Sequence, residues 1–154
     1  MGRKLVILAG FVALVVSMGG FSLASGRDST GPTDFSIIAT KVVFTTADVG
    51  AKGNSPGDEL VFTPTDVNLE GQTVGRLDGY CVFTEISGGN DHFEECMLTH
   101  TLKGGQITLQ GQFDQTATID NAFAVTGGTG IYSEARSQVI LHFLKKFRFN
   151  FELE

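Results

Sequence analysis

The chain has 154 residues, 42% of them hydrophobic, with 17 acidic and 11 basic side chains. This length suits one domain of about 100–200 residues with a core of its own. The net charge of −6 argues against nucleic-acid binding, because affinity for phosphates depends on clustered Lys and Arg. Two Cys residues are too few for a disulfide scaffold or a Cys-based structural zinc site.

The N-terminus has the layout of a secretory signal peptide. Arg3 and Lys4 give a positive start, an apolar run covers residues 5–18, and Ser22 and Ala24 are small residues suited to cleavage after Ala24. A membrane-spanning helix needs about 20 apolar residues, which is more than this run provides.

The whole chain is expected to divide into three parts. We expect residues 1–24 to be removed as the signal, 25–34 to form a flexible lead, and 35–154 to form the folded domain. The mature protein is then secreted, makes no membrane contact after cleavage and lies in an oxidising compartment.

From residue 35 onwards apolar and polar residues alternate with period 2, which predicts strands with one buried face. The predicted strands are residues 35–46, 58–63, 73–86, 93–102, 107–113, 120–126, 131–144 and 147–153. Their short links require antiparallel neighbours. The pattern therefore predicts an all-β fold, an eight-stranded antiparallel up-and-down barrel of the lipocalin-like kind. A two-sheet sandwich remains the alternative.

The two Cys residues fall opposite each other if residues 87–90 form a four-residue hairpin loop. That loop sets Ile86 opposite Asp91, and counting back sets Cys81 opposite Cys96. Directly opposed residues are close enough for a disulfide after slight adjustment. We expect this bond in a secreted protein, with two buried free thiols as the alternative.

Alternation then predicts which side chains face the barrel interior. If Cys81 faces inward, Phe83 does too, and the other strands add Cys96, Ile107 and Phe151. The residues predicted to contact a ligand are Cys81, Phe83, Leu98, His100, Leu109, Phe113 and Phe149.

The sequence offers three weak catalytic candidates. Tyr132 and Arg136 lie four apart in the predicted strand 131–144, so they share a face and could place a phenol and a guanidinium in the cavity. Asp78 is the third candidate, and Asp78 or Glu134 could pair with the buried Arg. The alternative is that Arg136 points to solvent.

No metal site or cofactor is expected. The three His residues lack the spacing of metal ligands, and Asp91, Glu94 and Glu95 read as a solvated acidic turn. The Gly-rich stretches 104–105 and 127–130 lack the Lys and the helix of a phosphate loop, so they read as tight turns.

Five segments in order resemble the allene oxide cyclase and dirigent superfamily, across residues 35–154. They are GDELVFT (57–63), VGRLDGYCVFTEI (74–86), GGQITLQG (104–111), FAVTGGTGIYSEARSQVILH (123–142) and FRFNFEL (147–153). The resemblance implies an eight-stranded barrel with an apolar cavity. In this superfamily such cavities guide cyclisation or coupling of reactive fatty-acid, phenolic or polyketide-like molecules.

The residues that would carry the chemistry match only in part. Cys81 stands where cyclases have a cavity-lining Cys, but Pro64 replaces their Asn and Phe113 their Tyr. On the dirigent side, Arg76 and Arg136 match the family's two Arg positions. Asp78 and Asp120 lie near the dirigent aspartates. True allene oxide cyclase activity is therefore not expected.

Three classes of function remain open. The first is a secreted barrel that binds a small apolar molecule and steers its cyclisation or coupling. The second is a lipocalin-like carrier without chemistry, and the third is a structural barrel filled by its 13 Phe side chains. Fold alone does not decide among them, and the sequence leaves homo-oligomer formation open.

Overall fold

The computed structural model describes residues 34–88, 91–116, 120–143 and 146–154. The expected signal peptide and all of the expected lead except Asp34 lie outside these residues. The strands are β1 (Asp34–Thr40), β2 (Phe44–Ala47), β3 (Glu59–Phe62), β4 (Thr65–Val67), β5 (Thr73–Gly88), β6 (Asp91–Leu102), β7 (Gly105–Asp114), β8 (Asn121–Gly128), β9 (Ser137–His142) and β10 (Phe147–Leu153).

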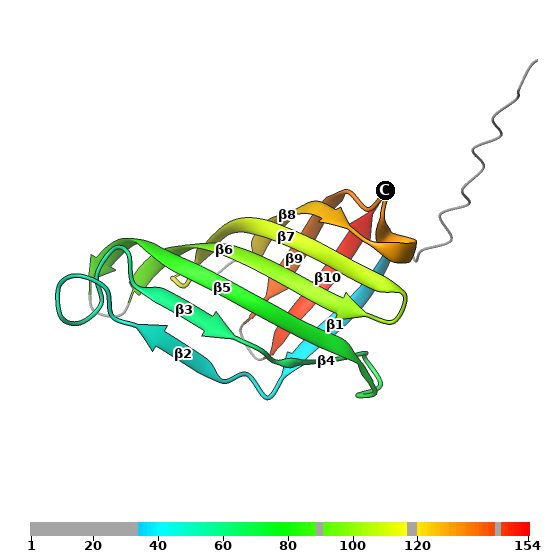
Figure 1. Ribbon diagram of the computed structural model, residues 1–154, viewed down its shortest axis with the longest axis horizontal. Coiled ribbons are helices and arrows are strands. Elements are labelled where there is room, and N and C mark those ends of the chain that lie inside the picture. Colours follow the sequence, from blue (N-terminus) through cyan, green and yellow to red (C-terminus); the bar gives the residue numbers. More distant parts are fainter. Residues whose placement is uncertain (1–33, 89–90, 117–119, 144–145) are drawn as a thin grey trace, which may run out of the picture.

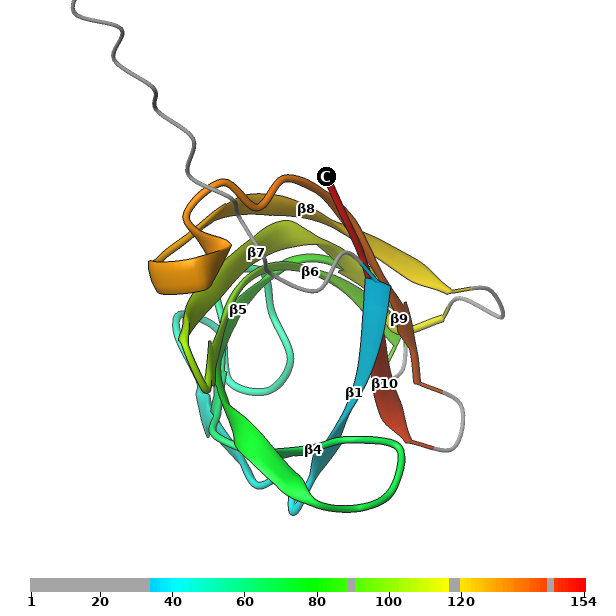
Figure 2. The ribbon, with the colours of Figure 1, turned by 90° about the vertical axis from the view of Figure 1, so that its right-hand side faces the viewer.

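These segments form one closed antiparallel barrel. The sheet runs in the order β2-β3-β5-β4-β1-β10-β9-β8-β7-β6, and the β5–β6 pairing closes it. The strands β1 and β2 act as two halves of one broken strand, as do β3 and β4, so the barrel has eight strands (Figure 1). Figure 2 shows the strands surrounding the interior. The predicted fold class is confirmed, and the sandwich alternative is wrong.

The two breaks lie side by side and have local causes. Between β1 and β2 the backbone of Lys41 turns to a positive φ of 56°. Between β3 and β4, Pro64 has no N–H to donate, and its carbonyl accepts a hydrogen bond from Leu77 N at 3.1 Å. The predicted strand 35–46 is therefore interrupted, and the strand predicted at 58–63 resumes beyond Pro64 as β4.

The long hairpin of β5 and β6 confirms the predicted disulfide. Cys81 lies opposite Cys96, with Cα atoms 4.0 Å apart and the sulfur atoms bonded. The predicted pairing at the tip is wrong, since Ile86 lies opposite His92 rather than Asp91. Two irregularities in β5 shift the register toward the tip and leave the Cys pair unaffected.

The barrel end near the start of β1 is closed by a turn that the sequence pattern assigned to a strand. Residues Gly130–Tyr132 form a 3-10 helix, and β9 begins only at Ser137. The turn is held to the β6–β7 loop because Ile131 N donates to Gly104 O at 3.0 Å. At Gly130, φ is 63° and a side chain would collide with Gly104 O, which confirms the tight turn expected for this Gly-rich stretch.

The core fills the half of the barrel nearest this turn. Phe149 and Phe151 of β10, Ile37 of β1, Ile107 of β7 and Val139 of β9 are almost fully buried there. None of the helical structure in the described residues is long and apolar enough to span a membrane.

Candidate functional site

A cavity of about 330 Å³ occupies the other half of the barrel. Such a volume lies at the lower end of the range, about 300–1,000 Å³, of pockets that hold small ligands. The lining residues are Ala39, Val42, Phe44, Leu60, Phe62, Pro64, Leu77, Cys81, Phe83, His92, Glu94, Cys96, Leu98, Phe113, Gln115, Phe123, Leu141, Phe143, Phe147 and Phe149. The cavity wall is therefore mainly apolar, with Phe its most frequent residue, and the Phe side chains do not fill the barrel.

The barrel wall beside the cavity is incomplete. Strand β2 pairs with β3, whereas β10 pairs with β1 and β9, so no backbone hydrogen bonds join β2 to β10. Across this interval the rings of Phe44 and Phe147 lie 6.2 Å apart in an edge arrangement. Phe44 is 47% exposed although it lines the cavity. The two rings thus flank this interval, where we expect the cavity mouth.

Most of the residues predicted to contact a ligand do line this cavity. Cys81, Phe83, Leu98, Phe113 and Phe149 are all part of its wall. The other two, His100 and Leu109, are fully buried but lie outside the lining set.

Glu94 and His92 form the main polar group of the wall. Glu94 is 3% exposed, and its Oε1 lies 2.6 Å from His92 Nε2. The His92 ring also stacks on Phe83, with centroids 4.0 Å apart. Burial raises the pKa of Glu94 above its ordinary 4.5, although the contact with His92 opposes this shift. The prediction that Glu94 belongs to a solvated acidic turn is therefore wrong.

The disulfide is part of the same wall. The Cys96 sulfur lies 3.9 Å from Glu94 Oε2. Cys81, Cys96 and Glu94 present potential metal-ligand atoms within 4.8 Å of one another. Because the two sulfur atoms are bonded to each other, they are not thiolates and offer no metal site in this state.

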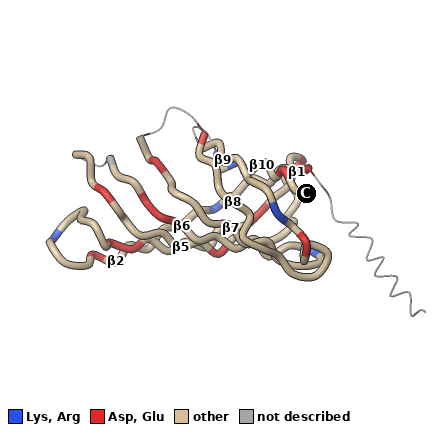
Figure 3. The backbone as a smooth tube through the Cα atoms, turned by 90° about the horizontal axis from the view of Figure 1, so that it is seen from above, with Lys and Arg blue, Asp and Glu red and all other residues tan. Residues whose placement is uncertain are grey.

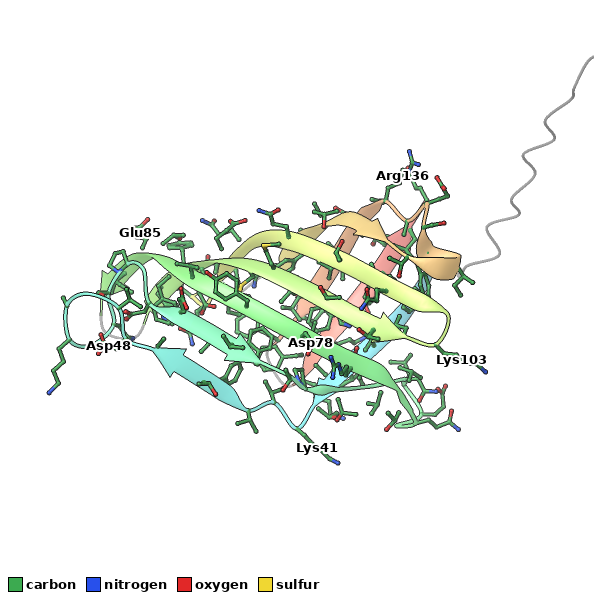
Figure 4. All side chains as sticks on the ribbon, viewed as in Figure 1. Lys41, Asp48, Asp78, Glu85, Lys103 and Arg136 are labelled. Carbon is green, nitrogen blue, oxygen red and sulfur yellow. A yellow bond between two sulfur atoms is a disulfide. The ribbon has the colours of Figure 1, made fainter. Side chains whose placement is uncertain are left out.

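The three catalytic candidates from the sequence lie away from the cavity. Arg136 points outward near the C-terminus (Figure 4), with its side chain 69% exposed and 3.7 Å from Glu134. Asp78 is on the outer face of β5 and pairs with Arg76 at 3.0 Å. Tyr132 is buried beside Phe35 at the closed end, and burial raises its pKa. The prediction that Tyr132 and Arg136 share the inner face of a strand is wrong, because residues 130–136 form a turn.

A second polar pair lies beneath the cavity floor. His100 Nδ1 and Asp66 Oδ2 are 2.8 Å apart, and both side chains are fully buried. The His100 ring meets the rings of Phe149 and Phe151 edge-on, at 4.8 and 5.2 Å. Asp66 is in the three-residue strand β4, for which the sequence pattern gave no expectation.

One available signal could have found the Glu94 pair. Alternation from Cys96, which predicted Leu98 and His100 to face inward, also predicts Glu94 and His92 to do so. The acidic composition of this stretch favours solvent exposure instead, and for Glu94 that interpretation is wrong. No comparable signal indicates Asp66, because the break at Pro64 disrupts the alternation before it.

Among the described residues, Lys and Arg do not gather into a site. Lys and Arg are scattered over the described part of the backbone (Figure 3). The third His, His142, pairs with Asp120 at 2.5 Å in a half-exposed position.

Comparisons with known proteins place the architecture. No protein-family model matches the sequence, and comparison with curated proteins finds no relative. Among solved structures, a pyocyanin demethylase is similar with a TM-score of 0.69 and 22% identity, covering 79% of this chain and 99% of that one.

Two further solved structures are similar at lower identity. The pterocarpan synthase dirigent protein PsPTS1 has a TM-score of 0.57 and 14% identity, covering 78% of this chain and 90% of its own. The Diels Alderase AbmU from Streptomyces koyangensis has a TM-score of 0.55 and 16% identity, covering 75% and 62%. The chain therefore has the fold shared by dirigent proteins and cyclase barrels, as its sequence resemblance to the allene oxide cyclase and dirigent superfamily predicted.

Proposed function

We propose that this barrel binds a small, largely apolar molecule in its cavity and steers the cyclisation or coupling of that molecule. The observation that carries the proposal is the hollow, mainly apolar cavity with Glu94 buried in its wall. A dry cavity of this kind favours one conformer of a reactive ligand and excludes water. A carboxyl with a raised pKa can donate or accept a proton there.

The similar solved structures support the proposal. They include a pyocyanin demethylase, a pterocarpan synthase dirigent protein and a Diels Alderase. All three act on small molecules, and a fold that serves several chemistries leaves the substrate to the residues of the site.

A carrier without chemistry is the second candidate, favoured by the lack of a charged group other than the Glu94–His92 pair among the described lining residues. The two candidates differ in what happens to the ligand. A molecule copurifying with the natively exported protein can be identified by mass spectrometry and added back. Steering predicts a changed isomer or a coupled product, whereas carriage predicts recovery of the molecule unchanged.

We also propose that the chain is exported and cleaved near Ser25. The disulfide is compatible with an oxidising compartment. The N-terminal pattern is typical of a signal peptide that directs export. Intact-mass measurement of the exported protein should give the mass of a chain that starts near Ser25. A full-length chain in the membrane fraction would contradict export.

Ligand binding can be tested with two substitutions on neighbouring positions of β6. Leu98 lines the cavity, whereas Met97 faces outward and is 59% exposed. Leu98→Trp should reduce the affinity for the fluorescent apolar probe N-phenyl-1-naphthylamine at least tenfold by filling the cavity. Met97→Trp adds the same ring outside and should leave the affinity unchanged. Equal affinities for both variants, with unchanged circular dichroism, would show that the probe binds elsewhere.

A further inference from the structure

The Cys81–Cys96 disulfide is shielded from bulk solvent but borders the cavity. Each of the two Cys residues is only 2% exposed, so a reagent in bulk water has little access to the bond from outside. Both residues line the cavity, so a molecule inside the barrel contacts them. The bond is therefore presented to the inside of the barrel.

A disulfide is an electrophile whose natural attacking group is a thiolate. The thiolate bonds to one sulfur atom, forms a mixed disulfide and releases the other sulfur as a new thiolate. Because the wall around this disulfide is mainly apolar, a thiol carried on an apolar body gains free energy by entering the cavity, and a hydrophilic thiol does not. The surroundings of the bond therefore select a reductant by its apolar surface.

Glu94 lies beside one of the two sulfur atoms. Its Oε2 is 3.9 Å from Cys96 Sγ, a distance that suits a hydrogen bond from a thiol, but the bonded sulfur carries no proton. Release of Cys96 would create this donor next to the carboxyl group. Burial raises the pKa of Glu94, which favours the form that can give a proton to a departing thiolate. Attack on Cys81 with departure of Cys96 is thus the favoured direction.

We propose that the Cys81–Cys96 disulfide is a redox site that oxidises an apolar dithiol bound in the cavity. This inference rests on the proposed binding function and adds a reaction and a ligand class. The first ligand sulfur bonds to Cys81 Sγ, the bond between the two Cys sulfur atoms breaks, and Cys96 leaves and takes a proton from Glu94. Glu94 regains the proton that the first ligand thiol gave up.

The second ligand thiol completes the reaction. Its sulfur attacks the first ligand sulfur, closes a cyclic ligand disulfide and releases Cys81, which takes up the proton of this second thiol. In total, two electrons and two protons pass from the dithiol to the Cys pair. The products are a cyclic disulfide and a barrel with two Cys thiols.

Two dithiols with the same four-carbon spacing between their sulfur atoms test the proposal. They are ortho-xylylene dithiol, which carries an aromatic ring, and dithiothreitol, which carries two hydroxyl groups. Reactions with the oxidised protein are quenched with acid, freed of dithiol and alkylated in denaturant, and intact mass then counts the Cys thiols. The aromatic dithiol should reduce the folded protein at least about tenfold faster than dithiothreitol, after division by the same ratio for the urea-unfolded chain.

Four variants locate the reaction. Leu98→Trp fills the cavity and should remove most of the advantage of the aromatic dithiol, whereas Met97→Trp places the same ring on the exposed face and should keep it. Glu94→Gln cannot give a proton and should slow the aromatic dithiol at least threefold. Glu95→Gln, on the exposed side of β6, should leave that rate unchanged.

The contrary results are distinct from one another. Equal rate ratios for the folded and the unfolded chain would overturn the proposal, because the disulfide would then be reached by unfolding. An advantage kept in Leu98→Trp would exclude attack from the cavity. An unchanged or faster reaction in Glu94→Gln would contradict proton transfer to Cys96. All of these leave the proposed binding function standing if N-phenyl-1-naphthylamine still binds in the cavity, whereas loss of both the rate advantage and probe binding overturns the two proposals together.

Discussion

Glu94 and Glu95 are adjacent residues of the same type that face opposite sides of β6. Glu95 is exposed and accepts a hydrogen bond from Gln110 at 3.1 Å. Glu94 is buried against His92 and the disulfide. Successive side chains of a strand point to opposite faces. A shift of one residue along β6 therefore separates a solvated carboxylate from one that is buried in the wall of an apolar cavity.

The raised pKa of Glu94 predicts how stability changes with pH. A carboxyl whose pKa rises on folding favours the folded state while it is protonated, and this contribution is lost as pH rises from about 4.5 through the folded pKa. Glu94→Gln keeps the shape and cannot ionise. We therefore expect it to equal the wild type in stability near pH 4 and to exceed it near pH 8, by urea unfolding.

The matched control for this substitution is Glu95→Gln, which should show no such pH-dependent gain. A wild type more stable than Glu94→Gln near pH 8 would mean that the contact with His92 outweighs the cost of burial.

Asp58 shows the opposite pKa behaviour. Its carboxylate accepts hydrogen bonds from Val49 N at 2.7 Å and Ser55 N at 2.8 Å, and these bonds lower its pKa below 3.8. Its stabilising effect is therefore present above the unfolded pKa and is lost as pH falls through the folded pKa. Asp58→Asn should be less stable than the wild type at pH 7, with the difference shrinking below pH 4 in acid-unfolding titrations. A constant difference across this range would contradict the assignment.

At the scale of elements, the β5–β6 hairpin combines the disulfide, the polar pair and much of the cavity wall. The period-2 pattern predicted its face assignment and the Cys81–Cys96 pairing correctly. It could not predict the register shifts near the tip, because inserted residues alter the pairing without changing the composition. The pattern also predicts a strand where residues 130–136 form a turn, because apolar and polar residues alternate there as they do in a strand.

Removing the disulfide tests the hairpin. Cys81 and Cys96 are separated by 15 residues, and closing a loop of that size contributes about 3 kcal/mol. The double variant Cys81→Ala/Cys96→Ala should lose about that much unfolding free energy in urea. A loss below about 0.5 kcal/mol would show that the bond restricts the unfolded chain very little.

Gly79 makes room on β5 for the Phe62 ring. A Cβ at this position would lie 2.2 Å from that ring, which lines the cavity. Gly79→Ala should therefore displace Phe62, alter the cavity and change the affinity for N-phenyl-1-naphthylamine at least threefold. Gly53→Ala, where nothing lies within 4 Å but φ is 88°, controls for backbone strain and should leave the affinity unchanged. An unchanged affinity in Gly79→Ala would show that the Phe62 ring does not shape the binding site.

At the scale of the whole molecule, the barrel is closed and packed at one end and hollow at the other. The sequence predicted the strands and the apolar interior, because alternation reports which faces are buried. It could not decide between a filled and a hollow barrel, since that depends on how the Phe rings meet in space. The breaks at Lys41 and Pro64 lie beside the hollow half, where β2 separates from β10.

This arrangement predicts that the ring pair at the mouth controls the rate of ligand exchange. Phe147→Ala removes the partner of Phe44 and should raise both association and dissociation rate constants several-fold in stopped-flow fluorescence. Val61→Ala, an exposed position of β3, should change neither rate. Unchanged rates in Phe147→Ala would place the entrance elsewhere.

Intermolecular nuclear Overhauser effects show whether the cavity holds a small apolar molecule. With N-phenyl-1-naphthylamine bound, we expect contacts from the probe to the methyl groups of Leu77 and Leu98 inside the barrel. Val61 and Met97 lie in one outward-facing row with Tyr80 and offer an apolar surface outside. Contacts to Val61 and Met97, with none to Leu77 or Leu98, would contradict the claim.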